Sequence, residues 1–225
     1  MINAVIFDMY ETLITLAEGQ GYFGRHMAVD LGLPLGEFLP LWHATENDRT
    51  LGRTTENEVI SNLLKHFGCY SDEVLEKIIS KRINGSLYGF EHMNPEIEPL
   101  LEELKKRELK VALISNCYFN EARVIRESRL MKYFDQVCLS YEEGVAKPDP
   151  EIYLRCLKKL GLAPGECLYV GDGGSSELEG AYEAGMMAVQ ALWYMKNIEA
   201  HPEWINPRFT GLKTPMEVLR LTEDC

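Results

Sequence analysis

Short apolar runs alternate with longer amphipathic segments along most of the chain. The apolar runs are Ala4–Phe7, Lys110–Ile114, Gln136–Leu139, Cys167–Val170 and Met187–Ala191. Segments with helical periodicity follow them, as in "PEIEPLLEELKKREL" and "DPEIYLRCLKKLGL". Continuous apolar strands that alternate with helices indicate a parallel sheet covered on both faces. We therefore predict an α/β fold with a doubly wound parallel sheet.

One long segment breaks this alternation. Residues 15–90 contain several helical stretches, separated by glycines and prolines, and no convincing strand. We therefore predict an α-helical domain at 15–90, inserted into an α/β core domain made of residues 1–14 and 91–225. The tail of the chain is less regular, except that "TPMEVLRLT" predicts a closing helix with Thr214 as N-cap and Pro215 in the first turn.

Composition narrows the classes of function. Of the 225 residues, 46% are apolar and 26% charged, which is typical of an ordinary globular protein. The formal net charge of −12 argues against a nucleic-acid partner, because nucleic-acid binding needs a basic surface. A small anionic substrate stays possible, since a metal ion or local basic groups can reverse the field inside one cleft.

Cysteine usage and apolar run lengths suggest where the protein resides. The six cysteines form no C-x-x-C pair, which argues against a zinc site or a disulfide framework and fits a reducing compartment. The first apolar run is too short for a signal peptide, and no run approaches membrane-spanning length. We therefore expect a cytoplasmic protein with no membrane partner. The sequence does not indicate an oligomeric state.

Polar residues follow four of the predicted strands. Asp8 ends the first run, Ser115-Asn116 ends the second, and Lys147 follows the third. The fourth leads into the glycine-rich loop "GDGGSSE", which contains Asp172 and Glu177. Ligands of open α/β sheets bind outside the carboxyl ends of the strands. Each residue alone could be a turn or cap residue, but together they predict a site with carboxylates, a hydroxyl and an ammonium group.

These residues resemble the motifs of the haloacid dehalogenase superfamily of hydrolases, and the resemblance covers nearly the whole chain. The four matching motifs are Asp8-Met9-Tyr10-Glu11-Thr12-Leu13, then Ser115, then Lys147-Pro148, and finally Gly171, Asp172 and Glu177. The long helical segment between the first two motifs is similar to members with a helical cap of the first type. The resemblance thus implies a Rossmann-like core with an inserted cap.

The resemblance also implies roles for individual residues. Asp8 would be a nucleophile that forms a covalent aspartyl intermediate. In the phosphatases of the family, Mg²⁺ would be held by Asp8, the Tyr10 backbone carbonyl, Asp172 and, directly or through water, Glu177. Ser115 and Asn116 would bind substrate oxygens, Lys147 would neutralise developing charge, and Thr12 would order the loop by hydrogen bonding.

Tyr10 departs from the phosphatase pattern. Family phosphatases usually carry a second aspartate at this place, which protonates the leaving oxygen and then activates water. A phenol with a pKa of roughly 10 replaces it poorly. A tyrosine at this place instead resembles the 2-haloacid dehalogenases, which use no metal. Glu11 stands where the family usually has glycine, either as a solvent-facing acid or as a substitute acid/base.

The acidic fourth motif favours the phosphatase, because the repulsion of Asp172 and Glu177 near Asp8 is best relieved by Mg²⁺. We therefore expect a Mg²⁺-dependent phosphatase acting on a small phosphorylated metabolite. The alternatives are a 2-haloacid dehalogenase-like hydrolase and a catalytically impaired member that binds phosphorylated ligands. Arg49 and Arg53 are only candidates for a substrate-binding or halide-binding arginine, and the pattern around them favours solvated helix-end arginines.

Overall fold

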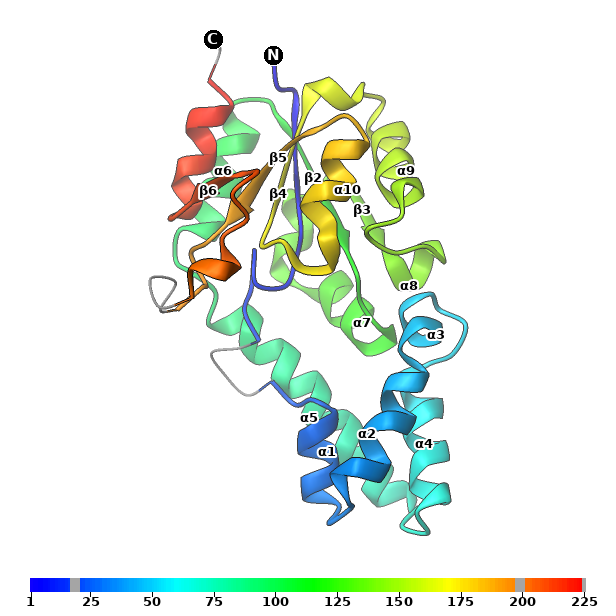
Figure 1. Ribbon diagram of the computed structural model, residues 1–225. Helices are drawn as coiled ribbons and strands as arrows, with labels where there is room; N and C mark the ends of the chain where they lie inside the picture. The colour runs from blue at the N-terminus through cyan, green and yellow to red at the C-terminus, as the bar shows by residue number, and fades with distance from the viewer. Residues whose placement is uncertain (17–20, 197–200, 224–225) are drawn as a thin grey trace.

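Six parallel strands form one sheet in the computed structural model, which describes residues 1–16, 21–196 and 201–223. The strand order is β3-β2-β1-β4-β5-β6, with β1 paired to both β2 and β4 (Figure 1). The strands are β1 Ala4–Phe7, β2 Lys110–Ser115, β3 Gln136–Leu139, β4 Cys167–Gly171, β5 Met187–Ala191 and β6 Thr210–Leu212. The predicted doubly wound α/β fold is therefore confirmed, with a sixth strand that the irregular tail did not reveal.

Alternate residues of each strand pack into two hydrophobic cores, one on each face of the sheet. In β1, Val5 and Phe7 belong to one core, whereas Ala4 and Ile6 belong to the other. All four side chains are fully buried. A strand buried on both faces needs a continuous apolar run, since successive side chains point to opposite sides. This explains why β1 shows no polar alternation and why its first polar residue, Asp8, comes at its carboxyl end.

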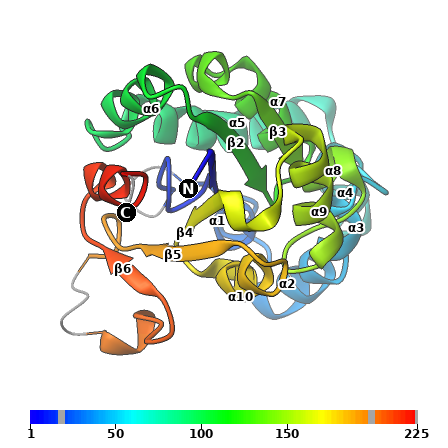
Figure 2. The same cartoon turned by 90° about the horizontal axis from the view of Figure 1, so that it is seen from above.

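Helices cover both faces of the sheet, as Figure 2 shows from above. On one face lie α6 Ile97–Lys106, α7 Phe119–Glu127 and the 3₁₀ segments Arg129–Tyr133 and Pro215–Leu221; on the other lie α9 Pro150–Leu160 and α10 Glu177–Glu183. Shorter elements are α8 Ser140–Glu143 and 3₁₀ turns at Pro164–Glu166, Gly174–Ser176 and Pro202–Trp204. The predicted closing helix begins at Pro215 after Thr214, but it is a 3₁₀ helix.

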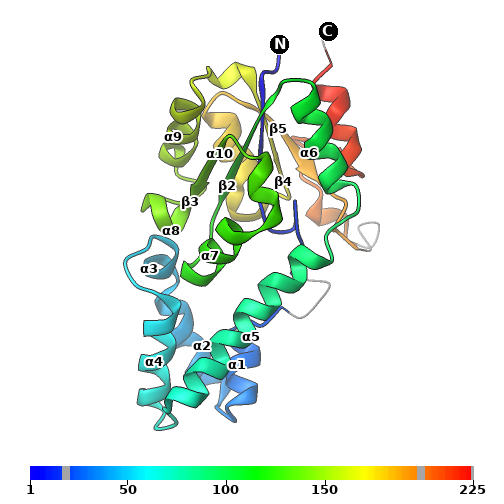
Figure 3. The ribbon, with the colours of Figure 1, turned by 180° about the vertical axis from the view of Figure 1, so that it is seen from behind.

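The inserted segment is entirely helical in the part that the structure describes. Its helices are α1 Gly24–Asp30, α2 Leu35–Ala44, α3 Glu46–Thr50, α4 Glu56–His66 and α5 Asp72–Glu91. The Thr55 and Ser71 side chains cap α4 and α5 by accepting hydrogen bonds from backbone N–H groups. Helices α1, α2, α4 and α5 share a hydrophobic core, and the five helices lie below the carboxyl edge of the sheet (Figures 1 and 3).

Helix α5 connects the helical insertion to the sheet. It ends at Glu91, one residue beyond the predicted boundary, and Phe90 near its end packs into the core of the α/β part. The division of the chain at residues 15 and 90 into two domains stays a prediction. No helix in the described ranges is both long and apolar enough to cross a membrane.

Candidate active site

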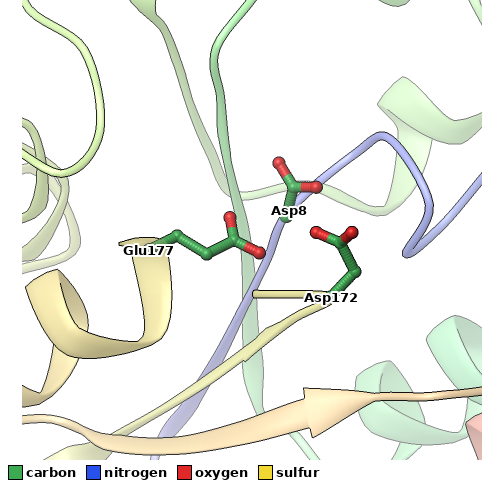
Figure 4. Close-up of side chains that lie close together, drawn as sticks. All are labelled: Asp8, Asp172 and Glu177. Carbon is green, nitrogen blue, oxygen red and sulfur yellow. The ribbon is translucent and has the colours of Figure 1, made fainter. Parts of the chain in front are cut away.

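Three carboxylates meet at the carboxyl edge of the sheet. Asp8 follows β1, Asp172 follows β4, and Glu177 is the first residue of α10. One oxygen of each lies within 4.8 Å of the others, and Figure 4 shows the three side chains pointing toward one another. The adjacency of β1 and β4 brings Asp8 and Asp172 together, because both strands end at the same edge.

Lys147 is the cation at the centre of this cluster. Its Nζ donates hydrogen bonds to Asp8 Oδ1 (2.5 Å) and to Glu177 Oε2, and lies 3.2 Å from Tyr169 Oη. Tyr169 also donates to Glu177 Oε2 (2.8 Å). The Lys147 side chain is only 3% exposed. Burial alone would lower the pKa of Lys147. The negative charges of Asp8 and Glu177 raise this pKa by more than burial lowers it, so the side chain stays an ammonium ion.

The carboxylates outnumber the cation. Burial, followed by the charge of Glu177, raises the pKa of Asp8 to about 8, against the lowering effect of Lys147. Burial and Glu177 likewise raise the pKa of Asp172 to about 6. Three carboxylates with one ammonium would leave a net charge of about −2 if all were ionised, which is unfavourable away from water. These oxygen ligands therefore fit a divalent cation.

The Asn116 side chain positions Lys147 by binding the backbone of Lys147. The Asn116 side chain donates from Nδ2 to the Lys147 carbonyl (2.9 Å), and its Oδ1 accepts from the Lys147 N–H (2.8 Å). Just beyond, Asp149 caps α9 by accepting from Glu151 N–H, and Pro150 occupies the first helical turn. The predicted substrate-binding role of Asn116 therefore competes with a role the structure shows: both ends of its amide bind Lys147.

The loop after β4 is built around Glu177. A Cβ at Gly171 would lie 2.1 Å from Glu177 Oε1, so only glycine leaves room for this carboxylate. Gly173, at φ +101°, donates its N–H to the same oxygen (3.1 Å). Ser175 and Ser176 adopt left-handed backbone conformations, which non-glycine residues seldom do. The "GDGGSSE" motif therefore fixes both the position and the orientation of Glu177.

Glu11 occupies the strained position in the loop after β1. Its φ of +55° lies in the left-handed region that favours glycine. The Glu11 carboxylate accepts hydrogen bonds from Thr15 Oγ1 (2.6 Å) and from the Leu16 N–H (2.8 Å). Both carboxylate oxygens of Glu11 are therefore used to hold the loop. This weakens the hypothesis that Glu11 is the substitute acid/base.

Two residues outside the predicted set also hold this loop. Trp193 Nε1 donates to the Thr12 carbonyl (2.8 Å), and the Tyr194 hydroxyl donates to the Leu13 carbonyl (3.2 Å). The Thr12 hydroxyl, by contrast, is buried without a hydrogen-bond partner among the described residues. The hydrogen bond that Thr12 contributes to the loop is therefore made by its carbonyl. Nothing in the "LWYM" sequence beyond the aromatic residues themselves signals these contacts.

Tyr10 lies next to the carboxylates but cannot act as an ordinary acid. Its hydroxyl is buried and has no hydrogen-bond partner in the described part of the chain. Burial raises the pKa of Tyr10 well above its usual value, and Glu121 is the next contributor. The phenol therefore keeps its proton at neutral pH and is a poor replacement for the second aspartate.

A cavity of about 380 Å³ separates the helical insertion from the sheet beside Tyr10. Its lining residues come from both parts: Phe23, Gly24, Trp42, His43, Glu46, Thr50 and Arg82 from the insertion, and Tyr10, Asn116, Cys117, Tyr118, Glu121 and Ser175 from the α/β part. Tyr10, Asn116 and Ser175 belong to the loops that carry the reactive groups. The cavity therefore lies beside the loops that follow β1, β2 and β4, although Asp8 and Lys147 are not among its lining residues.

The two candidate arginines lie elsewhere. Arg49 is fully buried, stacks on the Trp42 ring with its guanidinium carbon 3.4 Å from the ring centre, and donates to the Trp42 carbonyl (3.0 Å). Arg53 is 60% exposed and pairs with Asp48 (3.1 Å). Neither is among the lining residues of the cavity. Arg53 matches the solvated reading, whereas Arg49 stabilises the corner between α2 and α3.

Ser115 and Tyr169 complete the site. The Ser115 side chain is buried at the end of β2, and its hydroxyl makes one long hydrogen bond, to the Asn116 carbonyl (3.4 Å). It therefore keeps capacity for an incoming oxygen. The sequence does not indicate a role for Tyr169 in the site, because a tyrosine in the apolar run "CLYV" is typical of an ordinary core residue. Its partners come from α10 and from the segment before α9, which strand periodicity alone cannot bring together.

Known proteins resemble most of the chain. A family model described as haloacid dehalogenase-like hydrolase matches residues 2–185. The glyceraldehyde 3-phosphate phosphatase of Methanopyrus kandleri is 26% identical over 196 residues, covering 84% of both chains. The phosphoserine phosphatase of Thermus thermophilus is 34% identical over 118 residues, which cover 52% of this chain and 45% of that protein.

Solved structures share the fold. A 2-haloacid dehalogenase from Pseudomonas syringae superposes with a TM-score of 0.70 at 23% identity, covering 99% of this chain and 98% of that one. An enzyme from Bacteroides thetaiotaomicron, solved in complex with magnesium and inorganic phosphate, gives a TM-score of 0.62 at 18% identity, covering 85% and 94%. At these identities the likeness extends to the fold alone.

Proposed function

Because this chain belongs to the haloacid dehalogenase-like hydrolases, we propose that it is a Mg²⁺-dependent phosphatase of small phosphorylated metabolites, working through an aspartyl-phosphate at Asp8. The observation that carries the proposal is the cluster of Asp8, Asp172 and Glu177 around Lys147. A charge-neutral halide-displacement site has no need of so many carboxylates. Curated relatives named as phosphatases support the same reaction class.

Asp8 and Asp172 would hold the metal, with the Tyr10 carbonyl, and with Glu177 either direct or through water. Glu177 already accepts from Lys147, Tyr169 and Gly173, so it fits the more distant role better. Mg²⁺ prefers oxygen ligands and retains several waters, which suits this donor set. When bound, the ion supplies positive charge that keeps both aspartates ionised and offsets the charge of the phosphoryl oxygens.

The protein's own residues account for the first half of the reaction. Asp8 Oδ attacks phosphorus, forming the aspartyl-phosphate while the bond to the leaving oxygen breaks. The Lys147 ammonium ion, fixed by Asn116 and Glu177, neutralises charge that develops on the phosphoryl group. The Ser115 hydroxyl is placed to donate to a phosphoryl oxygen. Water then attacks the aspartyl-phosphate, which releases phosphate and restores Asp8.

The leaving oxygen needs a proton that Tyr10 supplies poorly. The buried phenol keeps its proton at neutral pH, because burial raises its pKa well above the usual value. Esters with acidic leaving groups, such as aryl phosphates, should therefore react faster than alkyl phosphates relative to ordinary family phosphatases. Hydrolysis of the aspartyl-phosphate should also be slow, because the same residue would normally activate water.

Tyr10 favours a second candidate, a 2-haloacid dehalogenase-like hydrolase that uses Asp8 in the same way. Displacing a halide requires no proton donor, so a tyrosine would carry no penalty. The excess of carboxylates beside Asp8 opposes this reading.

We further propose that α1–α5 act as a cap over the site, supported by the cavity between them and the sheet. The five cysteines in the described ranges are free, which suits a cytoplasmic location.

A metal titration against phosphate esters tests the proposal. Aryl phosphate hydrolysis should rise with Mg²⁺, stop with EDTA and be lost in Asp8→Asn. Activity that survives EDTA or the Asp8→Asn change would contradict the proposal. Halide release from 2-chloropropionate without Mg²⁺ would instead establish the dehalogenase.

A further inference from the structure

The cavity beside Tyr10 is placed to receive the part of the substrate that leaves with the oxygen, and the inference below rests on the proposed phosphatase function. Its walls include Tyr10, Asn116 and Ser175, which belong to the loops that hold Asp8, Lys147 and Asp172. Tyr10 lies two residues after Asp8 and Asn116 directly follows Ser115, so the ester chain of a phosphoryl group at Asp8 has this space beside it. At about 380 Å³, the cavity lies at the small end of ligand pockets.

Two charged residues of the cavity wall keep unused hydrogen-bonding capacity. Glu121 Oε2 accepts from the Tyr118 N–H (2.8 Å), but Oε1 lies 3.6 Å from Arg82 Nη2, beyond hydrogen-bond distance. The other guanidinium nitrogens of Arg82 donate to Glu56 Oε1 (2.6 Å) and to the Tyr22 carbonyl (2.8 Å). Within the described residues, Glu121 Oε1 and Arg82 Nη2 thus form an ion pair at 3.6 Å, but neither atom makes a hydrogen bond.

The buried hydroxyl of Tyr10 adds a third polar group with no partner in the described part of the chain. It belongs to the same wall and lies close enough to Glu121 for that carboxylate to raise the pKa of the phenol. A phenolic hydroxyl both donates and accepts. An acceptor, a donor and a group that does both therefore belong to residues that line this one cavity.

The charges of the wall leave little preference for an ionic ligand. Arg82 lies between Glu56 and Glu121, and burial followed by Glu56 raises the pKa of Glu121 to about 7. Glu46, the other acid of the wall, contacts His43 Nδ1 at 3.5 Å. A ligand cation would face Arg82 and a ligand anion would face Glu121, so either one would meet a like charge at short range.

Hydroxyl groups satisfy all three polar groups at once, because each hydroxyl donates one hydrogen bond and accepts others. A vicinal diol could donate to Glu121 Oε1 and accept from Arg82 Nη2 without bringing any charge. Phe23 and Tyr118 provide aromatic walls for the carbon skeleton, and Phe23 is 46% exposed at the edge of the cavity. We propose that Glu121 and Arg82 select a polyhydroxylated leaving group, so that the substrate is a sugar or polyol phosphate.

The test compares esters that differ in their hydroxyl and ionic groups. With Mg²⁺ present, kcat/KM should be about 10- to 100-fold higher for ribose 5-phosphate or glycerol 3-phosphate than for butyl phosphate, 3-aminopropyl phosphate and 3-phosphoglycerate. Glu121→Gln should reduce the ratio of sugar phosphate to butyl phosphate by about 10-fold, because an amide donates where the carboxylate accepts. Glu121→Asp should lower it less.

Glu127→Gln is the matched control, since Glu127 lies on the same helix with its side chain 74% exposed. This control should keep the wild-type ratio. An unchanged ratio in Glu121→Gln, or a preference for the amino or carboxylate ester, would overturn the inference while leaving the phosphatase proposal intact.

A binding measurement separates the two proposals if no ester is hydrolysed. Ribose 5-phosphate binding can be followed by the fluorescence of Trp42, which lines the cavity. Binding that is weakened by Glu121→Gln, and not by Glu127→Gln, would support the selected ligand class and contradict the phosphatase. Absence of both binding and hydrolysis would contradict both proposals.

Discussion

At the scale of single residues, the exchange of the usual aspartate for Tyr10 has the largest consequence for chemistry. Its hydroxyl is buried, holds its proton and has no hydrogen-bond partner among the described residues. Asp8, by contrast, keeps its hydrogen bond with Lys147. The site therefore has a nucleophile and a charge-neutralising group, but it lacks an effective proton donor for the leaving oxygen.

The change Tyr10→Asp should restore this donor. We expect turnover of alkyl phosphates to rise by about 10-fold or more, because general acid–base catalysis is typically worth 10²–10⁴-fold. Aryl phosphates, which need little protonation, should change much less. Steady-state kinetics on matched alkyl and aryl esters would measure the effect. If both ester classes respond equally, Tyr10 is not the reason for the deficit.

Asn116 should affect catalysis through Lys147. Asn116→Ala removes two hydrogen bonds to the Lys147 backbone and should lower kcat by about 10-fold, with a loss of about 1–2 kcal/mol in unfolding free energy. Asn62→Ala, on the exposed side of α4, is the control and should leave both quantities nearly unchanged. Urea denaturation and kinetics would check this. A large change in KM with kcat preserved would instead favour direct substrate binding by Asn116.

At the scale of elements, a buried polar network joins the helical insertion to the α/β part. Glu56 at the start of α4 and Arg82 in α5 form an ion pair of 2.6 Å, with side chains 0% and 8% exposed. Glu56 Oε2 also accepts from the Asn120 N–H of α7 (3.2 Å), and Asn120 Nδ2 donates to Asn57 Oδ1 (2.8 Å). Helix α7 directly follows the loop that contains Asn116, just after Ser115 at the end of β2, so this network also supports the site.

Removing one member of this network should be costly. Arg82→Met leaves Glu56 buried without its cation and should lower the unfolding free energy by about 3–5 kcal/mol. Arg53→Met removes an exposed pair with Asp48 and should cost less than about 1 kcal/mol. Denaturant titrations of both variants would give the comparison. Equal losses in the two would mean that burial of the Arg82 pair does not govern its contribution.

Sequence patterns predict the strands of this fold better than its contacts. The sequence predicts β1 to β5 because strands buried on both faces require unbroken apolar runs. β6 has only three residues and follows an irregular stretch, so its pattern is too short to read. The strand-end rule also places Asp8, Lys147 and Asp172 at one edge. It says nothing of Tyr169 or Trp193, whose roles depend on how distant segments pack.

At the scale of the whole molecule, the carboxylate cluster links stability to pH and to metal. The pKa values of Asp172 and Asp8 are raised to about 6 and about 8 in the folded protein, from an ordinary value of 3.8. Between pH 3.8 and the raised pKa values of about 6 and about 8, the folded state therefore binds more protons than the unfolded state. By linkage, the stability of the metal-free protein falls as pH rises through this range.

Mg²⁺ should remove this pH dependence. Without metal, we expect the unfolding free energy to decrease between pH 4 and pH 8, by roughly 3 kcal/mol from Asp172 alone. Saturating Mg²⁺ should flatten the profile by favouring the ionised carboxylates. Asp172→Asn should make the metal-free profile shallower, with the contribution of Asp8 remaining, and should respond less to Mg²⁺. Denaturant titrations across pH would show this, and a rise in metal-free stability toward pH 8 would contradict the account.

The proposed reaction depends most on Asp8 acting as a nucleophile toward phosphorus. The most direct measurement is acid quenching of the enzyme during turnover of an aryl phosphate with Mg²⁺, followed by mass spectrometry of the peptide that contains Asp8. We predict a phosphoryl adduct on Asp8, present only with Mg²⁺ and absent in Asp8→Asn, at high occupancy because Tyr10 activates water poorly. Turnover without any adduct on Asp8, or turnover that persists in Asp8→Asn, would contradict the central claim.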